Sequence, residues 1–289
     1  MRKHIYIANH SKQKLGGGFT FIDNLVKGSQ NRCRFVDKWQ DAHTIFIPSS
    51  SMAVKDEVYA AKDAKRRIVF RVDNMPKNSR NKNTGSSRME AYAKIADVII
   101  FQSEWAKSYV GEWLSTVHKV DISKSPIIYN GVDPEYFYFK DDPKNRGETY
   151  LFSTYNTDEN KRYTEAAYDF YKRSMYNLKK GRPRPKLTLV GNFAKELIEY
   201  KFDFFNNEEI NFIPVISEKA KMGDIYRKNR YLYFPAFADA SPNTVGEAIS
   251  CGCEVLLPNQ IGGTVECINL FTQKKYDIYD MYEQYSRWF

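Results

Sequence analysis

Short apolar segments rich in β-branched and aromatic residues alternate with segments of helical pattern along this chain of 289 residues. Strands that alternate with helices form parallel sheets with helices on both faces. The alternation therefore predicts an α/β fold. The expected strands cover 4–9, 43–48, 66–73, 97–103, 125–132, 149–154, 186–191, 231–237 and 254–258, and the expected helices 21–28, 104–114, 164–180, 244–251 and 277–289.

The Pro-, Asp- and Lys-rich stretch 133–147 predicts a linker near the middle of the chain. At this length each half is able to bury its own core. We therefore expect an N-terminal domain over 1–133 and a C-terminal domain over 134–270, followed by an amphipathic tail over 271–289 that packs on protein.

Hydrophobic residues make up 42% of the chain, the mean hydropathy is −0.60, and no apolar run of 18 residues occurs. A soluble protein with neither membrane insertion nor signal peptide is expected. The cysteines, Cys33, Cys251, Cys253 and Cys267, and the four scattered histidines have no metal-ligand spacing. We expect no metal, a monomer, and the cytoplasm as compartment, or the host cytoplasm if the chain is phage-encoded.

The stretch 237–252, FADASPNTVGEAISCG, places two carboxylates, Asp239 and Glu247, on either side of a Ser-Pro-Asn-Thr turn. Pro242 fits the first turn of a helix, which Ser241 or Asn243 is able to cap. The amides of Thr244 and Val245 then face an anion, and Glu247 lies one turn further on. A ligand with phosphates and sugar hydroxyls suits this arrangement; two solvated surface acids are the alternative.

This stretch resembles the nucleotide-sugar signature of GT-B glycosyltransferases of the family 4 type, in which two Glu residues are separated by seven positions around a Pro-Asn-Thr-like turn. Asp239 replaces the first Glu. The segment 127–133, IIYNGVD, is similar to the interdomain turn of the same group. The resemblance implies two facing Rossmann-like domains with a cleft between them, and a C-terminal helix that crosses back to the first domain.

The resemblance also implies transfer of a sugar from a nucleoside diphosphate, which we expect to be UDP-linked, with retention of anomeric configuration and without a cofactor. Asp239 would hold hydroxyls of the transferred sugar, and Glu247 those of the ribose. Amides near Asn243, Thr244 and Val245 would bind the diphosphate, together with the glycine loop Gly16, Gly17 and Gly18.

A further part of the donor site is expected in STYNTDENKRY, residues 153–163. Enzymes of the resembled group carry there an Arg and, six residues on, a Lys that bind the diphosphate. Lys161 matches the Lys, Tyr155 takes the place of the Arg, and Arg162 is the expected substitute. A solvated basic pair at a helix start is the alternative, although cations there are mildly unfavourable unless an anion is near.

The whole positive charge lies in the first half of the chain. Residues 1–133 carry 22 Lys and Arg against 13 Asp and Glu, and residues 134–289 carry 22 of each. A basic surface on one domain suggests a polyanionic partner, which we expect to be duplex DNA, or else only a solubilising loop. The expected contacts are Arg66, Arg67, Arg71, Lys77, Arg80, Lys82 and Arg88.

Asp73 is the candidate for orienting the acceptor hydroxyl or the sugar, and Glu104 is a weaker one. An ordinary surface ion pair between Arg71 and Asp73 is the alternative. Together these features predict a glycosyltransferase acting on a hydroxymethylated base in DNA, as in enzymes of the bacteriophage type. A transferase for an envelope polysaccharide or lipid-linked glycan, and a non-catalytic nucleic-acid-binding protein on the same fold, are the two other hypotheses.

Overall fold

The computed structural model describes residues 2–9, 16–73, 84–154, 159–192 and 209–289. Within these ranges the chain divides into two units. Unit 1 comprises Met1–Gly131 and Tyr276–Phe289, and unit 2 comprises Val132–Lys275. Lys77, Arg80, Lys82 and Tyr155 lie outside the described residues.

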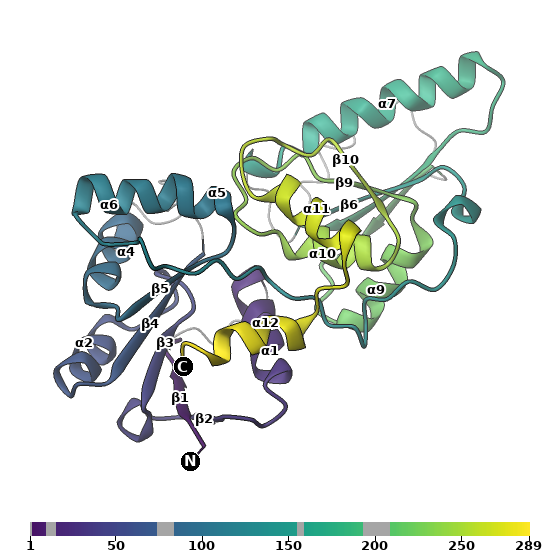
Figure 1. The fold of residues 1–289 in the computed structure, drawn as a ribbon. Helices are drawn as coiled ribbons and strands as arrows, with labels where there is room; N and C mark the ends of the chain where they lie inside the picture. The colour runs from purple at the N-terminus through teal and green to yellow at the C-terminus, as the bar shows by residue number, and fades with distance from the viewer. Residues whose placement is uncertain (1, 10–15, 74–83, 155–158, 193–208) are drawn as a thin grey trace. The chain divides into compact units, whose positions relative to one another are not determined.

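Unit 1 contains a five-stranded parallel sheet in the order β2-β1-β3-β4-β5 (Figure 1). β3 and most of β4 are buried, which explains why their sequences read as continuous apolar runs. The strands are β1 (His4–Ile7), β2 (Arg34–Val36), β3 (Thr44–Ile47), β4 (Arg67–Val72) and β5 (Val98–Phe101).

The helices of unit 1 cover both faces of this sheet. α1 (Gly17–Gly28) leads from β1 outward to β2, whereas α2 (Lys55–Asp63) and α4 (Thr84–Ile95) connect strands in the opposite direction. Because parallel crossovers are right-handed, α1 lies on one face, and α2 and α4 on the other. A further helical stretch follows β5, formed by α5 (Glu104–Ala106), the π-helical segment η2 (Lys107–Gly111) and α6 (Glu112–His118).

The last helix, α12 (Ile278–Ser286), packs against α1 in unit 1. A Cβ on Gly28 would come within 2.3 Å of the Ile278 carbonyl oxygen, so the two helices are in close backbone contact. The rings of Phe21 and Tyr285 have centroids 5.6 Å apart, and Phe46 of β3 contacts both. The end of the chain therefore completes the core on the α1 face of the sheet.

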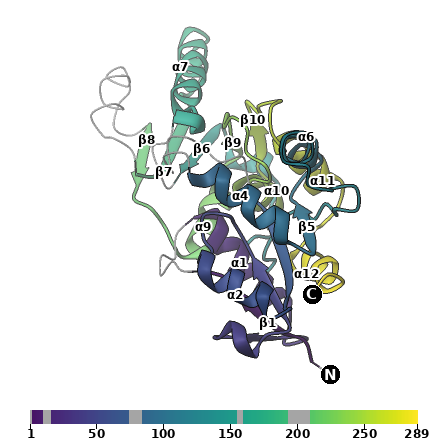
Figure 2. The same ribbon diagram turned by 90° about the vertical axis from the view of Figure 1, so that its left-hand side faces the viewer.

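Unit 2 contains a second five-stranded parallel sheet, in the order β10-β9-β6-β7-β8. Figure 2 shows the same strands and helices from another side. The strands are β6 (Thr149–Thr154), β7 (Lys186–Gly191), β8 (Ile210–Ile213), β9 (Tyr231–Tyr233) and β10 (Glu254–Leu256), and the helices are α7 (Tyr163–Lys179), α9 (Lys219–Lys228), α10 (Asn243–Ser250) and α11 (Thr264–Gln273).

The same handedness rule separates the helices of unit 2. α7 connects β6 to β7 in one direction, and α9 and α10 lead from β8 to β9 and from β9 to β10 in the other. α7 therefore covers one face, and α9 and α10 cover the opposite face. The core beneath α7 includes Tyr150 and Phe152 of β6 and Phe170 of α7.

The predicted α/β class with parallel sheets is confirmed. Two short strands, β2 and β8, were not predicted, because each has four residues or fewer and much exposed surface. The segment 125–132 was expected to be a strand, but no strand forms there, and Ile127 makes an isolated bridge with Phe101. No helix in the described ranges is long and apolar enough to cross a membrane.

Candidate functional site

The order of strands in unit 2 places a switch of direction between β6 and β9. Crossovers leave these two neighbouring strands toward opposite faces, and open α/β sheets bind ligands in the crevice that results at the carboxyl ends. Lys161 follows β6 and Asp239 follows β9. The topology therefore brings together two predicted residues that are 78 positions apart.

Lys161 and Asp239 form an ion pair at this edge. The Lys161 Nζ lies 3.3 Å from the Asp239 Oδ2, and their side chains are only 20% and 25% exposed. The same Nζ lies 5.9 Å from the centre of the Phe234 ring. A partly desolvated cation is thus held beside a carboxylate, where an anionic group and hydroxyl groups of one ligand would both find partners.

Backbone hydrogen bonds fix the loop that carries Asp239. Phe237 N–H donates to Asn160 O at 2.8 Å, Ala238 N–H to Ile261 O at 2.9 Å, and Gly263 N–H to Asp239 O at 2.8 Å. Gly262 has φ of +123°, and a Cβ there would lie within 2.9 Å of the Asp239 nitrogen. The pair Gly262-Gly263 was missed in the sequence, although a Gly-Gly between a strand and a helix signals close backbone approach.

Helix α10 starts as predicted but is capped differently. Its N-cap is Pro242, and no side chain caps the helix. Ser241, one of the two expected caps, instead lies with its Oγ 3.7 Å from the Cys267 Sγ. The Val245 amide donates to Pro242 O at 3.2 Å, so this predicted phosphate donor already has a partner. Gly252, with φ of +89°, ends the helix as predicted.

Glu247 lies partly buried on α10 and accepts a hydrogen bond from the Tyr226 hydroxyl of α9, at 3.3 Å. The pKa of Glu247 is raised to about 7, mainly by burial and in small part by the nearby Asp133, against the opposing effects of Tyr226 and Lys219. The Lys219 Nζ lies 3.9 Å from the Asp133 Oδ2. Glu247 therefore titrates near neutral pH.

Lys219, Tyr226 and Asp133 were not assigned to the site from the sequence. Lys219 and Tyr226 are seven residues apart on α9, so they share one face of that helix. This spacing is also typical of an ordinary packed helix. Only the contact between Tyr226 and Glu247 of α10 places this face of α9 beside the candidate site.

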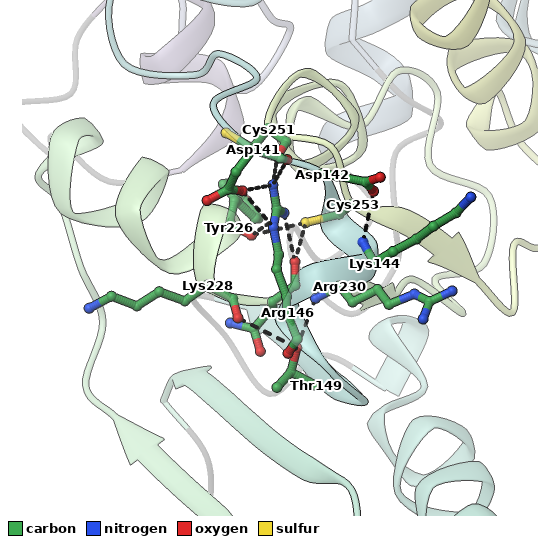
Figure 3. A network of polar contacts seen from close by, with 11 residues as sticks. Asp141, Asp142, Lys144, Arg146, Thr149, Tyr226, Lys228, Arg230, Cys251 and Cys253 are labelled. Carbon is green, nitrogen blue, oxygen red and sulfur yellow. Dashed lines mark hydrogen bonds and ion pairs between the residues drawn. The ribbon is translucent and has the colours of Figure 1, made fainter.

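The carboxyl ends of α9 and α10 are joined by one buried side chain, Arg146 (Figure 3). Its guanidinium donates to the carbonyls of Tyr226 and Asn229 at 3.4 and 3.0 Å and to that of Cys251 at 2.9 Å. It also pairs with Asp141 at 2.9 Å. A cation is favourable where helix carbonyls end, and this one fixes the two helices that carry Tyr226 and Glu247.

Arg162, expected to replace the missing cation, is directed elsewhere in the described structure. It forms the N-cap of α7 with a left-handed backbone, φ 52° and ψ 41°. Its Nη2 pairs with Glu165 at 2.5 Å on the surface. The positive charge beside the start of α7 is thus neutralised by a residue of the same helix.

In unit 1 the glycine loop also follows a switch point, which lies between β1 and β3. Gly16, with φ of +121°, is the N-cap of α1, while Gly17 and Gly18 belong to the helix. The prediction that all three glycines lie on a loop was wrong, because the helix begins about one turn earlier than expected, at Gly17. A Cβ on Gly18 would come within 2.8 Å of the Met52 sulfur.

Arg71 was expected on a DNA-binding surface or in a surface ion pair, and both expectations were wrong. Its side chain is buried, with the guanidinium 3.8 Å from the Phe21 ring centre. It donates to Pro48 O at 2.9 Å, to Asn130 Oδ1 at 3.0 Å and to Gln102 Oε1. Burial lowers the pKa of Arg71. The residue ties the carboxyl ends of the central strands together.

The other predicted acceptor residues occupy different parts of unit 1. Asp73, partly buried, follows the carboxyl end of β4. Arg66 and Arg67 lie at the amino end of the same strand, where Arg67 Nε donates to Trp288 O at 2.9 Å. Arg88 is exposed on α4, and Glu104 is exposed at the start of α5. Arg66 and Arg67 therefore do not share the edge of the sheet on which Asp73 lies.

All four cysteines are buried and free, and burial raises the pKa of Cys251 to about 11 and of Cys253 and Cys267 to about 12. Such thiols are inert. Among the described residues, no three His, Cys, Asp or Glu side chains gather in a way that would hold a metal ion.

No protein-family sequence model matches the chain, and no curated protein matches it in sequence. Solved structures do match over its whole length. HepE from Anabaena in complex with UDP has a TM-score of 0.72 at 12% identity, and sucrose-phosphate synthase from Thermosynechococcus elongatus has 0.67 at 11%. The E. coli trehalose-6-phosphate structure bound with UDP-2-fluoro glucose has 0.62 at 10%. Each alignment covers 99% of this chain and 98% of the other. The chain therefore has the fold of the GT-B glycosyltransferases.

Proposed function

We propose that this protein is a glycosyltransferase that uses a UDP-linked sugar as donor. The observation that supports it most strongly is the partly buried Lys161–Asp239 pair, at the switch point of unit 2. Similar folds have been solved with UDP and with UDP-2-fluoro glucose. Such a donor requires a site that recognises both its charged diphosphate and its sugar hydroxyls at one edge of the sheet.

Each residue has a defined part in this proposal. The diphosphate draws Lys161 away from Asp239 and lies near the start of α10, where the Thr244 amide and the helix dipole face it. The freed Asp239 carboxylate accepts hydrogen bonds from hydroxyls of the transferred sugar. Glu247 accepts those of the ribose.

The reaction proceeds by stabilising the leaving diphosphate. Negative charge develops on the diphosphate as the bond to the sugar breaks, and Lys161 and the oriented amides of α10 are positioned before the reaction begins. Asp73 orients the acceptor hydroxyl, whose oxygen forms the new bond to the anomeric carbon while its proton passes to the leaving diphosphate. We assign retention of anomeric configuration, which NMR of the product with a defined donor anomer would establish.

The donor assignment is tested with Glu247→Ala, Asp239→Asn and Lys161→Met, assayed for UDP release from a panel of UDP-sugars. We expect each to lower kcat/KM at least a hundredfold, because each removes a contact to the donor. Glu254→Gln changes an exposed carboxylate at the amino end of β10 and serves as control. Undiminished UDP release by Glu247→Ala would rule out the proposed site.

For the acceptor we propose a hydroxymethylated base in duplex DNA. The positive charge excess of residues 1–133 and the exposed Arg67 and Arg88 support a polyanionic partner. Free buried cysteines suit a reducing compartment such as the cytoplasm, where DNA is available. A base must leave the duplex stack to be modified by an enzyme of this kind.

The acceptor is tested by incubating the protein and a UDP-sugar panel with hydroxymethylated DNA, unmodified DNA and a lipid-linked glycan. Sugar found only on hydroxymethylated DNA would support the proposal, and sugar on the glycan alone would replace it with an envelope function. Binding of DNA without binding of any nucleotide sugar in a thermal-shift titration would instead indicate a non-catalytic nucleic-acid-binding protein.

A further inference from the structure

The second half of the chain has no net charge, yet one part of it is strongly basic. Residues 172–186 contain seven Lys and Arg residues and not one Asp or Glu. They form the carboxyl-terminal half of α7 and the connection to β7. This local excess was hidden by the neutral total of residues 134–289.

The outward face of α7 combines these cations with exposed aromatic rings. Tyr168, Lys172, Tyr176 and Lys180 follow one another at intervals of four, which aligns them along the helix. Tyr168 is 64% exposed and Tyr176 53%. The Lys172 Nζ lies 4.8 Å from the Tyr168 ring centre. α7 is the outermost helix of unit 2 in both views (Figures 1 and 2).

Most of these cations have no carboxylate partner within the described ranges of the chain. Two arginines are neutralised locally, since Arg173 pairs with Asp169 at 2.5 Å and Arg184 with Glu209 at 3.0 Å. The cations that form no ion pair with a described residue are Lys172, Lys179, Lys180, Arg182 and Lys186. Five uncompensated charges close together along the chain raise the local potential and attract an anion.

An open groove of about 500 Å³ lies beside this face, lined by Lys172, Tyr176, Asn177 and Arg182 among others. Its two carboxylates are already engaged. Glu148 accepts from Tyr150 at 2.8 Å and from Asn177 at 2.5 Å, and Asp169 accepts from Tyr233 at 2.9 Å as well as pairing with Arg173. The groove thus presents cations and an exposed ring to a ligand, while Asp169 is paired with Arg173 and Glu148 is held by hydrogen bonds from Tyr150 and Asn177.

We propose that the outer face of α7 and the adjoining groove bind the phosphate backbone of a nucleic acid, with an unstacked base lying against Tyr176. Cations that track phosphates and aromatic rings that stack on bases are the combination by which proteins bind single-stranded nucleic acid. A bilayer surface would require an apolar stripe, whereas the exposed side chains here are mainly Tyr and Lys, and the groove is polar.

The inference concerns a face of unit 2 opposite to α9 and α10. It names a binding surface for single-stranded nucleic acid, formed by other residues than those proposed to contact duplex DNA, and it does not depend on sugar transfer. DNA binding is therefore measured without nucleotide sugar. UDP release from a UDP-sugar is measured separately, so that failure of one proposal is distinguishable from failure of the other.

The test is fluorescence anisotropy of a labelled 20-nucleotide single strand at 50 and 200 mM salt. The triple variant Lys172→Glu/Lys179→Glu/Lys180→Glu should bind at least tenfold more weakly. Loss of three phosphate contacts should also lower the slope of log K against log salt by about 2. Tyr176→Ala should weaken the single strand by about tenfold, because it removes one stacking ring.

The matched control is Lys221→Glu/Lys228→Glu/Lys275→Glu, which changes net charge equally at exposed positions elsewhere in unit 2. Equal DNA affinity of the α7 triple variant and the wild type, with unchanged circular dichroism, would overturn the proposal. An equal loss of DNA affinity in the α7 variant and in the control variant would also overturn the proposal. Binding of anionic vesicles, but not of DNA, that is lost in the α7 variant would show a membrane surface instead.

Discussion

At the scale of single residues, the carboxylate of Glu247 is suited to accept hydrogen bonds from a ligand, but its burial lowers the stability of the folded protein. Burial raises its pKa from 4.5 to about 7, so its ionised form destabilises the free protein. This destabilisation, at most about 3 kcal/mol in the free energy of unfolding, is present above pH 7. It is relieved as the pH falls toward the pKa that the carboxyl group has in the unfolded chain. In the proposed donor site the ionised form accepts hydrogen bonds from the ribose hydroxyls, so we expect UDP affinity to have the opposite pH dependence.

We therefore expect the UDP affinity of the protein to fall as pH decreases through about 7. Tyr226→Phe removes the hydroxyl that lowers this pKa and should move the midpoint upward, whereas Asp133→Asn removes a charge that raises it and should move the midpoint downward. Isothermal titration with UDP from pH 5.5 to 8.5 measures both shifts. Midpoints that do not move in opposite directions would contradict the assignment.

At the scale of secondary-structure elements, the position of Glu247 depends on how α9 is held against α10. Arg146, whose side chain is 5% exposed, contacts the carboxyl ends of both helices. Arg146→Met removes hydrogen bonds to three carbonyls at the ends of these helices and the ion pair with Asp141, although Cys253 Sγ still donates to the carbonyls of Tyr226 and Asn229. The loss should be about 3 kcal/mol in the free energy of unfolding of unit 2.

Hydrogen exchange followed by mass spectrometry locates this effect. Amides of α9 and α10 should exchange faster in Arg146→Met, and those of unit 1 should not change. Arg230→Met is the matched control, because Arg230 forms an ion pair with Glu254 at 3.5 Å on the surface and should contribute less than about 1 kcal/mol. Equal exchange in the two variants would show that Arg146 does not hold these helices.

At the scale of the whole molecule, the chain passes between the units twice, at Gly131–Val132 and at Lys275–Tyr276. Within unit 1 the two ends lie together, since a Cβ on Gly131 would come within 2.3 Å of the Asp277 carbonyl oxygen. The segment that follows, with Tyr285 and Phe289, packs on Phe46. The sequence-distant ends of unit 1 therefore fold as one core.

Gly131→Ala should separate these two segments and lower the stability of unit 1 by about 1–3 kcal/mol, the usual cost of overpacking. All four tryptophans, Trp39, Trp105, Trp113 and Trp288, belong to unit 1, so urea unfolding followed by tryptophan fluorescence reports on that unit. Gly181→Ala, in unit 2, has φ of +63° and should leave this fluorescence midpoint unchanged. An unchanged midpoint in Gly131→Ala would show that the contact is not needed.

Local patterns in the sequence determined the elements. The apolar runs of β3, β4 and β6 and the helix from Pro242 to Gly252 were recognisable, because strand burial and helix ends depend on neighbours in sequence. The carboxylates Asp239 and Glu247 were recognisable for the same reason. The short edge strands β2 and β8 were not, since their pairing depends on partners far along the chain.

Only the tertiary structure decided which charges are buried and which meet. Lys161 and Asp239 form a pair because β6 and β9 are neighbours in the sheet, and Tyr226 meets Glu247 because α9 and α10 share a face. Arg71 read as a surface cation, yet Gln102 and Asn130 bind it in the interior. Spacing along a chain encodes what a residue does to its own helix or strand, but strand order and crossover handedness determine which residues surround it.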